Sequence, residues 1–92
     1  MLWEMIKEIV DLGERIYNET SAYLSIDIST GTGTVNIYII DRGFEMNSKY
    51  DGWYRYTLLL SDAQEEFNRR QFEKAKTHML RLLEEEVNAN DV

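Results

Sequence analysis

The stretch that decides the fold reads GWYRYTLLL at positions 52–60 and continues directly into SDAQ at positions 61–64. Its aromatic and β-branched residues are typical of a strand that packs on one side and presents a patterned face on the other. Ser61 can cap a helix, and Gln64, three residues later, can close a capping box. The sequence therefore predicts a strand that passes, almost without a loop, into the last helix.

The N-terminal segment predicts an amphipathic helix over residues 2–17, because its apolar and charged residues separate onto two halves of a helix. Gly13 lies near the middle of the apolar half, where glycine costs about 1 kcal/mol of helix propensity relative to alanine. We expect the helix backbone to approach a sheet closely at this position. The apolar half contains Leu2, Met5, Ile6, Ile9, Val10, Gly13, Ile16 and Tyr17.

Two alternating runs, residues 22–29 and 35–40, flank a glycine-bearing turn at residues 30–33. This pattern predicts a β-hairpin. A polar loop is expected at residues 44–51, before the third strand. The residues predicted to be buried in strands and helices are Leu24, Ile26, Ile37, Ile39, Tyr56, Leu58, Ile9, Phe72 and Met79.

The last helix is expected over residues 62–87, with residues 88–92 frayed. Its apolar stripe is Phe72, Ala75, Met79, Leu82 and Leu83, and Phe67 lies out of phase with it. The whole chain, residues 1–92, is expected to form one domain. The fold class is α+β in the order α-β-β-β-α: a three-stranded antiparallel meander with two helices packed on one face.

Composition narrows the classes of function. The net charge of −7 argues against general affinity for nucleic acid, and the absence of cysteine excludes disulfides and thiolate metal sites. The N-terminus has neither the uninterrupted apolar centre of a signal peptide nor the length of a membrane span. We expect a soluble, cytoplasmic protein that does not bind a membrane.

No residues combine into a catalytic, cofactor or metal motif, so we expect no enzyme activity and no cofactor. The single histidine, His78, lies at the edge of the last helix's apolar stripe and has no companion cysteine or second histidine. A hydrogen-bonded or solvent-facing histidine is the expected outcome.

The sheet face away from the helices is the first candidate binding surface. It is predicted to carry Tyr23, Tyr38 and Trp53, with Arg55 among polar residues. Trp, Tyr and Arg dominate binding hot spots, so this face could bind a partner or a second copy of the chain. The alternative is that residues 42–51 or other parts of the chain cover it.

The first helix carries the second candidate surface, an acidic stripe of Glu4, Glu8, Asp11 and Glu14. It could read positive charge on a partner protein, or it could be an ordinary hydrated helix face.

The α-β-β-β-α order together with Lys74-Ala75-Lys76 in the last helix resembles the double-stranded-RNA-binding domain, which implies binding of an A-form duplex through shape and phosphates. The chain departs from that family just before the last helix, where its residues 61–66 are acidic. Pairing within the helix, such as Glu66 with Arg70, is the simpler explanation of the bases in this region.

In element order and acidity, the first helix, the meander and the acidic stripe resemble small accessory proteins of bacteriophages, such as anti-CRISPR proteins. This resemblance implies a protein-binding inhibitor or adaptor that presents carboxylates to a basic host surface. Two alternatives stay open: an RNA-binding domain that uses the basic part of the last helix, and a homodimeric structural component.

Overall fold

The computed structural model describes residues 1–41 and 53–90, with side chains up to Glu85. The chain forms α1 (Leu2–Glu19), β1 (Tyr23–Ser29), β2 (Thr34–Ile40), β3 (Trp53–Leu59), a 3₁₀ turn (Asp62–Gln64) and α2 (Glu65–Asn90). The predicted α-β-β-β-α order is confirmed. The last helix continues three residues beyond its predicted end, and the loop expected at residues 44–51 lies outside the described residues.

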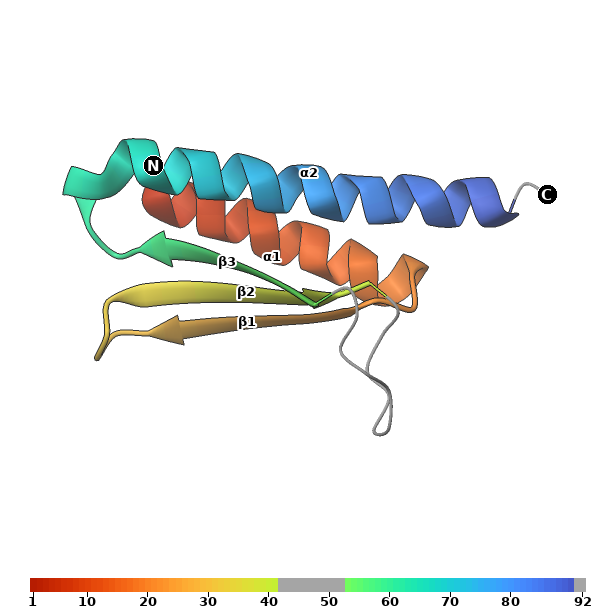
Figure 1. The fold of residues 1–92 in the computed structure, drawn as a ribbon, viewed down its shortest axis with the longest axis horizontal. Coiled ribbons are helices and arrows are strands. Elements are labelled where there is room, and N and C mark those ends of the chain that lie inside the picture. Colours follow the sequence, from red (N-terminus) through yellow and green to blue (C-terminus); the bar gives the residue numbers. More distant parts are fainter. Residues whose placement is uncertain (42–52, 91–92) are drawn as a thin grey trace.

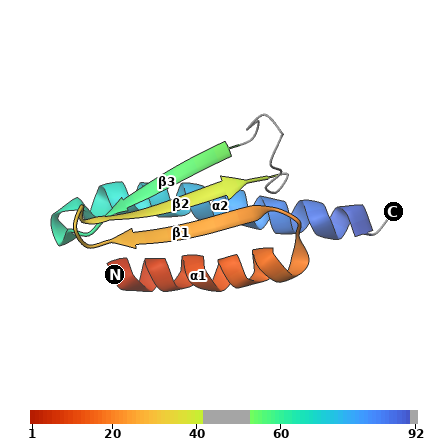
Figure 2. The ribbon, with the colours of Figure 1, turned by 90° about the horizontal axis from the view of Figure 1, so that it is seen from below.

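The molecule has two layers, a sheet and a pair of helices (Figure 1). The strands are antiparallel in the order β1-β2-β3. Seen from the side of the sheet, α2 lies behind the strands and α1 runs alongside β1 (Figure 2). The helices pack against each other, with α1 also on β1 and α2 also on β3. Within the described residues, no helix is both long and apolar enough to cross a membrane.

The strand register confirms the predicted faces of the sheet. Three cross-strand rows face the helices: Leu24–Ile39–Tyr54, Ile26–Ile37–Tyr56 and Ile28–Val35–Leu58. Because side chains alternate along a strand, the intervening residues point to the opposite face, where neither helix packs. Tyr23, Tyr38, Trp53 and Arg55 therefore lie on that open face, as predicted.

The core lies between the helices and the central strand. Six residues predicted to be buried are buried: Ile9, Ile37, Ile39, Leu58, Phe72 and Met79. Leu24, Ile26 and Tyr56 are only partly buried, because β1 and β3 are the edges of the sheet and have a neighbouring strand on one side only.

The buried stripe of α1 differs from the prediction. Val10 and Tyr17 are exposed, whereas Leu12 is buried. The reason is that α1 packs against α2 as well as β1, which shifts its buried stripe toward the α2 side of the helix.

Gly13 confirms the expected close approach of α1 to the sheet. A Cβ atom at this position would lie 2.6 Å from Cδ2 of Leu24, closer than carbon atoms can pack. The absence of a side chain at Gly13 is what allows α1 to reach β1.

The junction between β3 and α2 differs from a reciprocal capping box. The Ser61 hydroxyl accepts a hydrogen bond from the Ala63 N–H at 3.3 Å, so Ser61 caps the 3₁₀ turn that precedes α2. The backbone N–H of Ser61 donates to the Leu59 carbonyl instead of to the Gln64 side chain. Phe67 is half-exposed, and its neighbour Asn68 takes the buried position.

Candidate functional site

The open side of the sheet brings together four predicted site residues and one that was not singled out. Cross-strand pairing aligns Tyr23, Ile40 and Trp53 in one row and places Tyr38 beside Arg55 in the next. The rings of Tyr38 and Trp53 stack, with centroids 5.5 Å apart and planes 26° apart. We call these five residues the aromatic face.

The other half of the open sheet side is polar, and its groups satisfy one another. The Thr57 hydroxyl donates to Oδ1 of Asn36 at 2.8 Å, and Nδ2 of Asn36 donates to the Thr34 hydroxyl at 3.4 Å. Asn36 is thus engaged both across the strands, with Thr57, and along β2, with Thr34.

Exposure within the aromatic face is graded. Ile40 is 5% exposed, whereas Trp53 is 51% exposed. Arg55 is exposed and forms no ion pair with any described residue. The alternative that residues 42–51 cover this face concerns a segment outside the described residues.

The acidic stripe of α1 is exposed, but one of its four carboxylates, that of Glu8, is already paired with a base of α2. Glu8 forms an ion pair with Nζ of Lys76 on α2 at 2.6 Å, and the hydrogen bond that Lys76 donates to Glu8 raises the pKa of Lys76. Glu14 lies about 120° around the helix from Glu8, with Glu4 and Asp11 between them in angle. The stripe therefore spreads over the outer surface of α1 and is partly neutralised by α2.

The bases of α2 are mostly engaged with acids. Three of them pair one turn along the helix: Arg70 with Glu66 at 2.5 Å, Arg69 with Glu65 at 3.6 Å, and Arg81 with Glu85 at 3.6 Å. The predicted Glu66–Arg70 pair is confirmed. Of the two positions that carry the likeness to the RNA-binding family, Lys76 is paired with Glu8, so the basic surface is weaker than the sequence alone indicates.

His78 is buried and joins three elements, a contact set that sequence analysis missed. Its Nδ1 lies 2.8 Å from the Tyr56 hydroxyl on β3, and its Nε2 lies 2.6 Å from Oδ1 of Asp41 at the end of β2. Oδ2 of Asp41 in turn lies 3.5 Å from Arg81. The rings of His78 and Tyr54 are nearly perpendicular, with their centroids 4.5 Å apart. The expectation of a hydrogen-bonded histidine is met.

The proton positions in this network follow from its chemistry. An ionised carboxylate only accepts hydrogen bonds, so Nε2 of His78 donates to Asp41 and, in the neutral ring, Nδ1 accepts from Tyr56. Burial is the main cause that raises the pKa of Tyr56, and the nearby Arg81 opposes it. The phenol is therefore held in its protonated, donating form.

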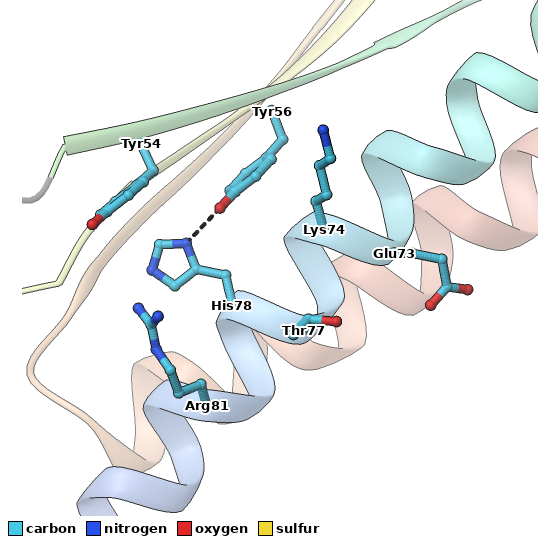
Figure 3. Close-up of a pocket in the computed structure, with 7 residues that line it drawn as sticks. All are labelled: Tyr54, Tyr56, Glu73, Lys74, Thr77, His78 and Arg81. Atoms are coloured by element: carbon cyan, nitrogen blue, oxygen red, sulfur yellow. Dashed lines mark hydrogen bonds between the residues drawn. The ribbon is translucent and has the colours of Figure 1, made fainter.

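A surface pocket of about 410 Å³ lies beside this network, between β3 and α2. Lys74 and Arg81 extend toward β3, whereas Glu73 points away from it (Figure 3). Both nitrogens of His78 are already bonded to protein groups, so the imidazole offers no free nitrogen to a bound molecule. Through His78, the network connects α2 to β3 and to the end of β2 by hydrogen bonds.

No three histidine or acidic side chains converge on a potential metal position in the described part of the chain. Sequence analysis missed the polar contacts of Asp41, Tyr56 and Asn68, whose partners lie on other elements, between 9 and 37 residues away. The alternating pattern could have placed Tyr56 opposite the last helix, but no local signal names its partner.

The chain matches no protein-family model, no curated protein and no solved structure.

Proposed function

We propose that this chain is a protein-binding module and that the aromatic face is its recognition surface. The observation that carries the proposal is the Tyr38–Trp53 stack, which lies beside Arg55 on the side of the sheet that neither helix covers. Aromatic rings held in place by stacking lose little conformational freedom on binding, which makes them effective anchors.

The chemistry of the face indicates the kind of partner. Stacked rings offer an apolar contact area, and Arg55 offers a guanidinium that pairs with a carboxylate. A protein surface with an apolar anchor next to an acidic side chain would fit both features. Such a module would act as an inhibitor or adaptor, the role that the resemblance to small acidic phage proteins implies.

The acidic stripe of α1 is the weaker binding surface. The Glu8–Lys76 ion pair holds one of its four carboxylates, and the remaining three are spread around the outer surface of the helix. Mimicry of a phosphate backbone needs carboxylates that are available to the partner's bases.

The immobilised chain should retain a specific partner from a lysate of its source cells, and Trp53→Ala and Tyr38→Ala should abolish that retention. Truncation of a central aromatic anchor costs about 2 kcal/mol or more, which is roughly a 30-fold loss of affinity. Retained proteins are identified by mass spectrometry, purified and titrated against each variant.

Phe67→Ala is the matched control, because Phe67 is a half-exposed aromatic residue on α2. It should retain the partner with unchanged affinity. Retention that survives Trp53→Ala but is lost when Glu4 and Asp11 are replaced by lysine would move the binding site to α1 and refute the proposal.

A further inference from the structure

The two edge strands of the sheet, β1 and β3, differ in whether their outward backbone groups are hydrogen-bonded by the rest of the chain. Along β3, the side chains of α2 take the place of a fourth strand. Asn68 accepts from the N–H of Leu59 at 2.7 Å and donates to the Leu59 carbonyl at 2.8 Å. Gln71 accepts from the N–H of Thr57 at 3.3 Å. This edge is therefore blocked along its second half.

The free edge of β1 carries the outward backbone groups of Leu24, Ile26 and Ile28. In an antiparallel sheet, the backbone groups of successive residues point alternately toward the neighbouring strand and away from it. Because the N–H of Thr57 points away from β2, toward Gln71, the strand pairing identifies Leu24, Ile26 and Ile28 as the residues of β1 whose backbone groups also point away from β2. No described side chain or backbone group bonds to the outward groups of these three residues. An edge of this kind is a template for another strand.

The exposed flank of α1 beside this edge is apolar. Trp3, Val10 and Tyr17, spaced by seven residues, are 60%, 48% and 83% exposed. They lie on the opposite flank of α1 from Glu8, which contacts α2. Tyr17 also lines a pocket of about 430 Å³ together with residues 21–24 at the start of β1. Because Tyr17 borders this pocket, the apolar flank lies on the β1 side of α1, and α1 itself runs alongside β1 (Figure 2).

The centre of the apolar flank and the centre of β1 coincide. Gly13 faces the side chains of Leu24 and Ile26, at 2.6 and 3.8 Å from its ideal Cβ position. Val10 lies three residues earlier, which is about 4.5 Å along the helix. Since α1 and β1 run in opposite directions and a strand rises about 3.3 Å per residue, Val10 is level with Ile26.

We propose that a second copy of this chain binds at the β1 edge and forms a two-fold symmetric dimer with a continuous six-stranded sheet. The two-fold axis passes through Ile26 and Val10, so that Ile26 pairs with the partner's Ile26 and Leu24 with the partner's Ile28. The two α1 helices then lie antiparallel, with Val10 against the partner's Val10 and Trp3 against the partner's Tyr17. In such an isologous interface, one two-fold axis must relate every pair of contacting residues. The strand pairing about Ile26 and the helix pairing about Val10 share one axis, because these two residues lie at the same level.

Charge complementarity favours this register. Lys7 and Glu14 lie on the exposed surface of α1 next to the apolar flank and form no ion pair with any described residue. Antiparallel packing about Val10 sets Lys7 beside the partner's Glu14. In the strands, Asp27 faces the partner's Ser25, whereas an axis moved to Asp27 would set two aspartates against each other. This proposal uses different residues from the aromatic face and does not depend on it.

Sedimentation analysis of the full chain over a concentration series tests the proposal. The wild type should be a dimer, and Val10→Glu should weaken the dimer on the order of 100-fold, since like charges would meet at the axis. Leu80→Glu, at a similarly exposed apolar position on α2, and Trp53→Ala should both remain dimeric. Circular dichroism establishes that each variant is folded.

A charge swap tests the orientation of the helices without touching the apolar contacts. Lys7→Glu should weaken the dimer, and Lys7→Glu combined with Glu14→Lys should restore it, because each change alone places like charges together. A monomeric wild type, a Val10→Glu variant that stays dimeric, or a double variant that is no tighter than Lys7→Glu would each overturn the proposal. A dimer lost through Trp53→Ala would instead assign self-association to the aromatic face.

Discussion

The side chain that best illustrates how single residues stabilise this fold is His78. It has both ring nitrogens bonded, to Tyr56 on one side and to Asp41 on the other, and it is 5% exposed. A buried polar group costs free energy unless it is hydrogen-bonded, and every buried side-chain nitrogen or oxygen among the described residues has a partner. His78 is thus a structural residue, although its position beside a pocket invites a catalytic interpretation.

Tyr56→Phe should lower the free energy of unfolding by about 1 kcal/mol near neutral pH, because Nδ1 of His78 loses its hydrogen-bond donor. The difference from the wild type should shrink as the pH rises above 10.0, the ordinary pKa of tyrosine. The pKa of Tyr56 is raised in the folded protein, so the unfolded chain loses this proton first and the stabilisation is lost as the pH rises through the folded pKa.

Urea denaturation over a pH series measures this difference. Lys76, whose pKa is also raised, contributes to the loss of stability at high pH, but it is present in both proteins and cancels in the comparison. Tyr38→Phe, at a tyrosine outside both the His78 network and the proposed dimer interface, serves as the control and should follow the wild type throughout. A constant difference between Tyr56→Phe and the wild type at all pH values would show that the phenol proton is not linked to folding.

At the scale of elements, α2 completes the sheet as well as covering it. Asn68 is 1% exposed and bonds to both the N–H and the C=O of Leu59. Its amide offers a donor and an acceptor with the spacing that a neighbouring strand would offer, so one side chain closes the end of the β3 edge.

Asn68→Ala should destabilise the protein by about 2 to 4 kcal/mol, because two backbone groups of Leu59 lose their partners. Asn68→Asp should destabilise the protein at least as much as Asn68→Ala at neutral pH, because it buries an unpaired carboxylate and sets one of its oxygens against the Leu59 carbonyl. Asn18→Ala, on the exposed surface of α1, should be close to the wild type in the same urea titration. An Asn68→Ala variant as stable as Asn18→Ala would mean that water replaces the amide without cost.

The fold was predictable from the sequence because its elements have clean local periods. Alternation in the strands gave the correct face for Leu24, Ile37 and Tyr56, and the period of α1 identified Gly13 as the point of closest approach. The aromatic face followed from the same alternation, since the residues between the buried ones point to the opposite side of the sheet.

The polar contacts were not predictable, because they depend on which elements meet. His78 and Asp41 are 37 residues apart, and nothing near either residue names the other. The exposure of Val10 and Tyr17 has the same origin: both are apolar residues on the apolar half of α1, and only the position of α2 decides that Leu12 is buried in place of them.

At the scale of the whole molecule, the two proposals combine into one arrangement. A dimer through β1 does not use the open side of the sheet and places two aromatic faces on the same side of a six-stranded sheet. Strand antiparallelism sets these faces toward opposite ends of that sheet. Binding of a partner with two equivalent sites would then gain from the effective concentration of the second site, with no further contact needed.

The charge of the whole molecule decides its affinity for nucleic acid. The net charge is −7, and the bases at Arg69, Arg70 and Arg81 are each paired with an acid on the same helix. A protein gains affinity for a duplex by exchanging counterions on the phosphates for its own bases. In this chain, each of these three arginines would first have to break its ion pair with a carboxylate one helical turn away.

We therefore expect no retention of duplex RNA or DNA by this chain in a gel-shift titration at physiological salt. Charge neutralisation provides the internal control: Glu65→Gln with Glu66→Gln frees Arg69 and Arg70 and should raise affinity at low salt. Tight binding by the wild type, falling steeply with salt and abolished by Lys74→Glu, would contradict the expectation. It would establish the basic part of α2 as an RNA-binding surface despite the acids that surround it.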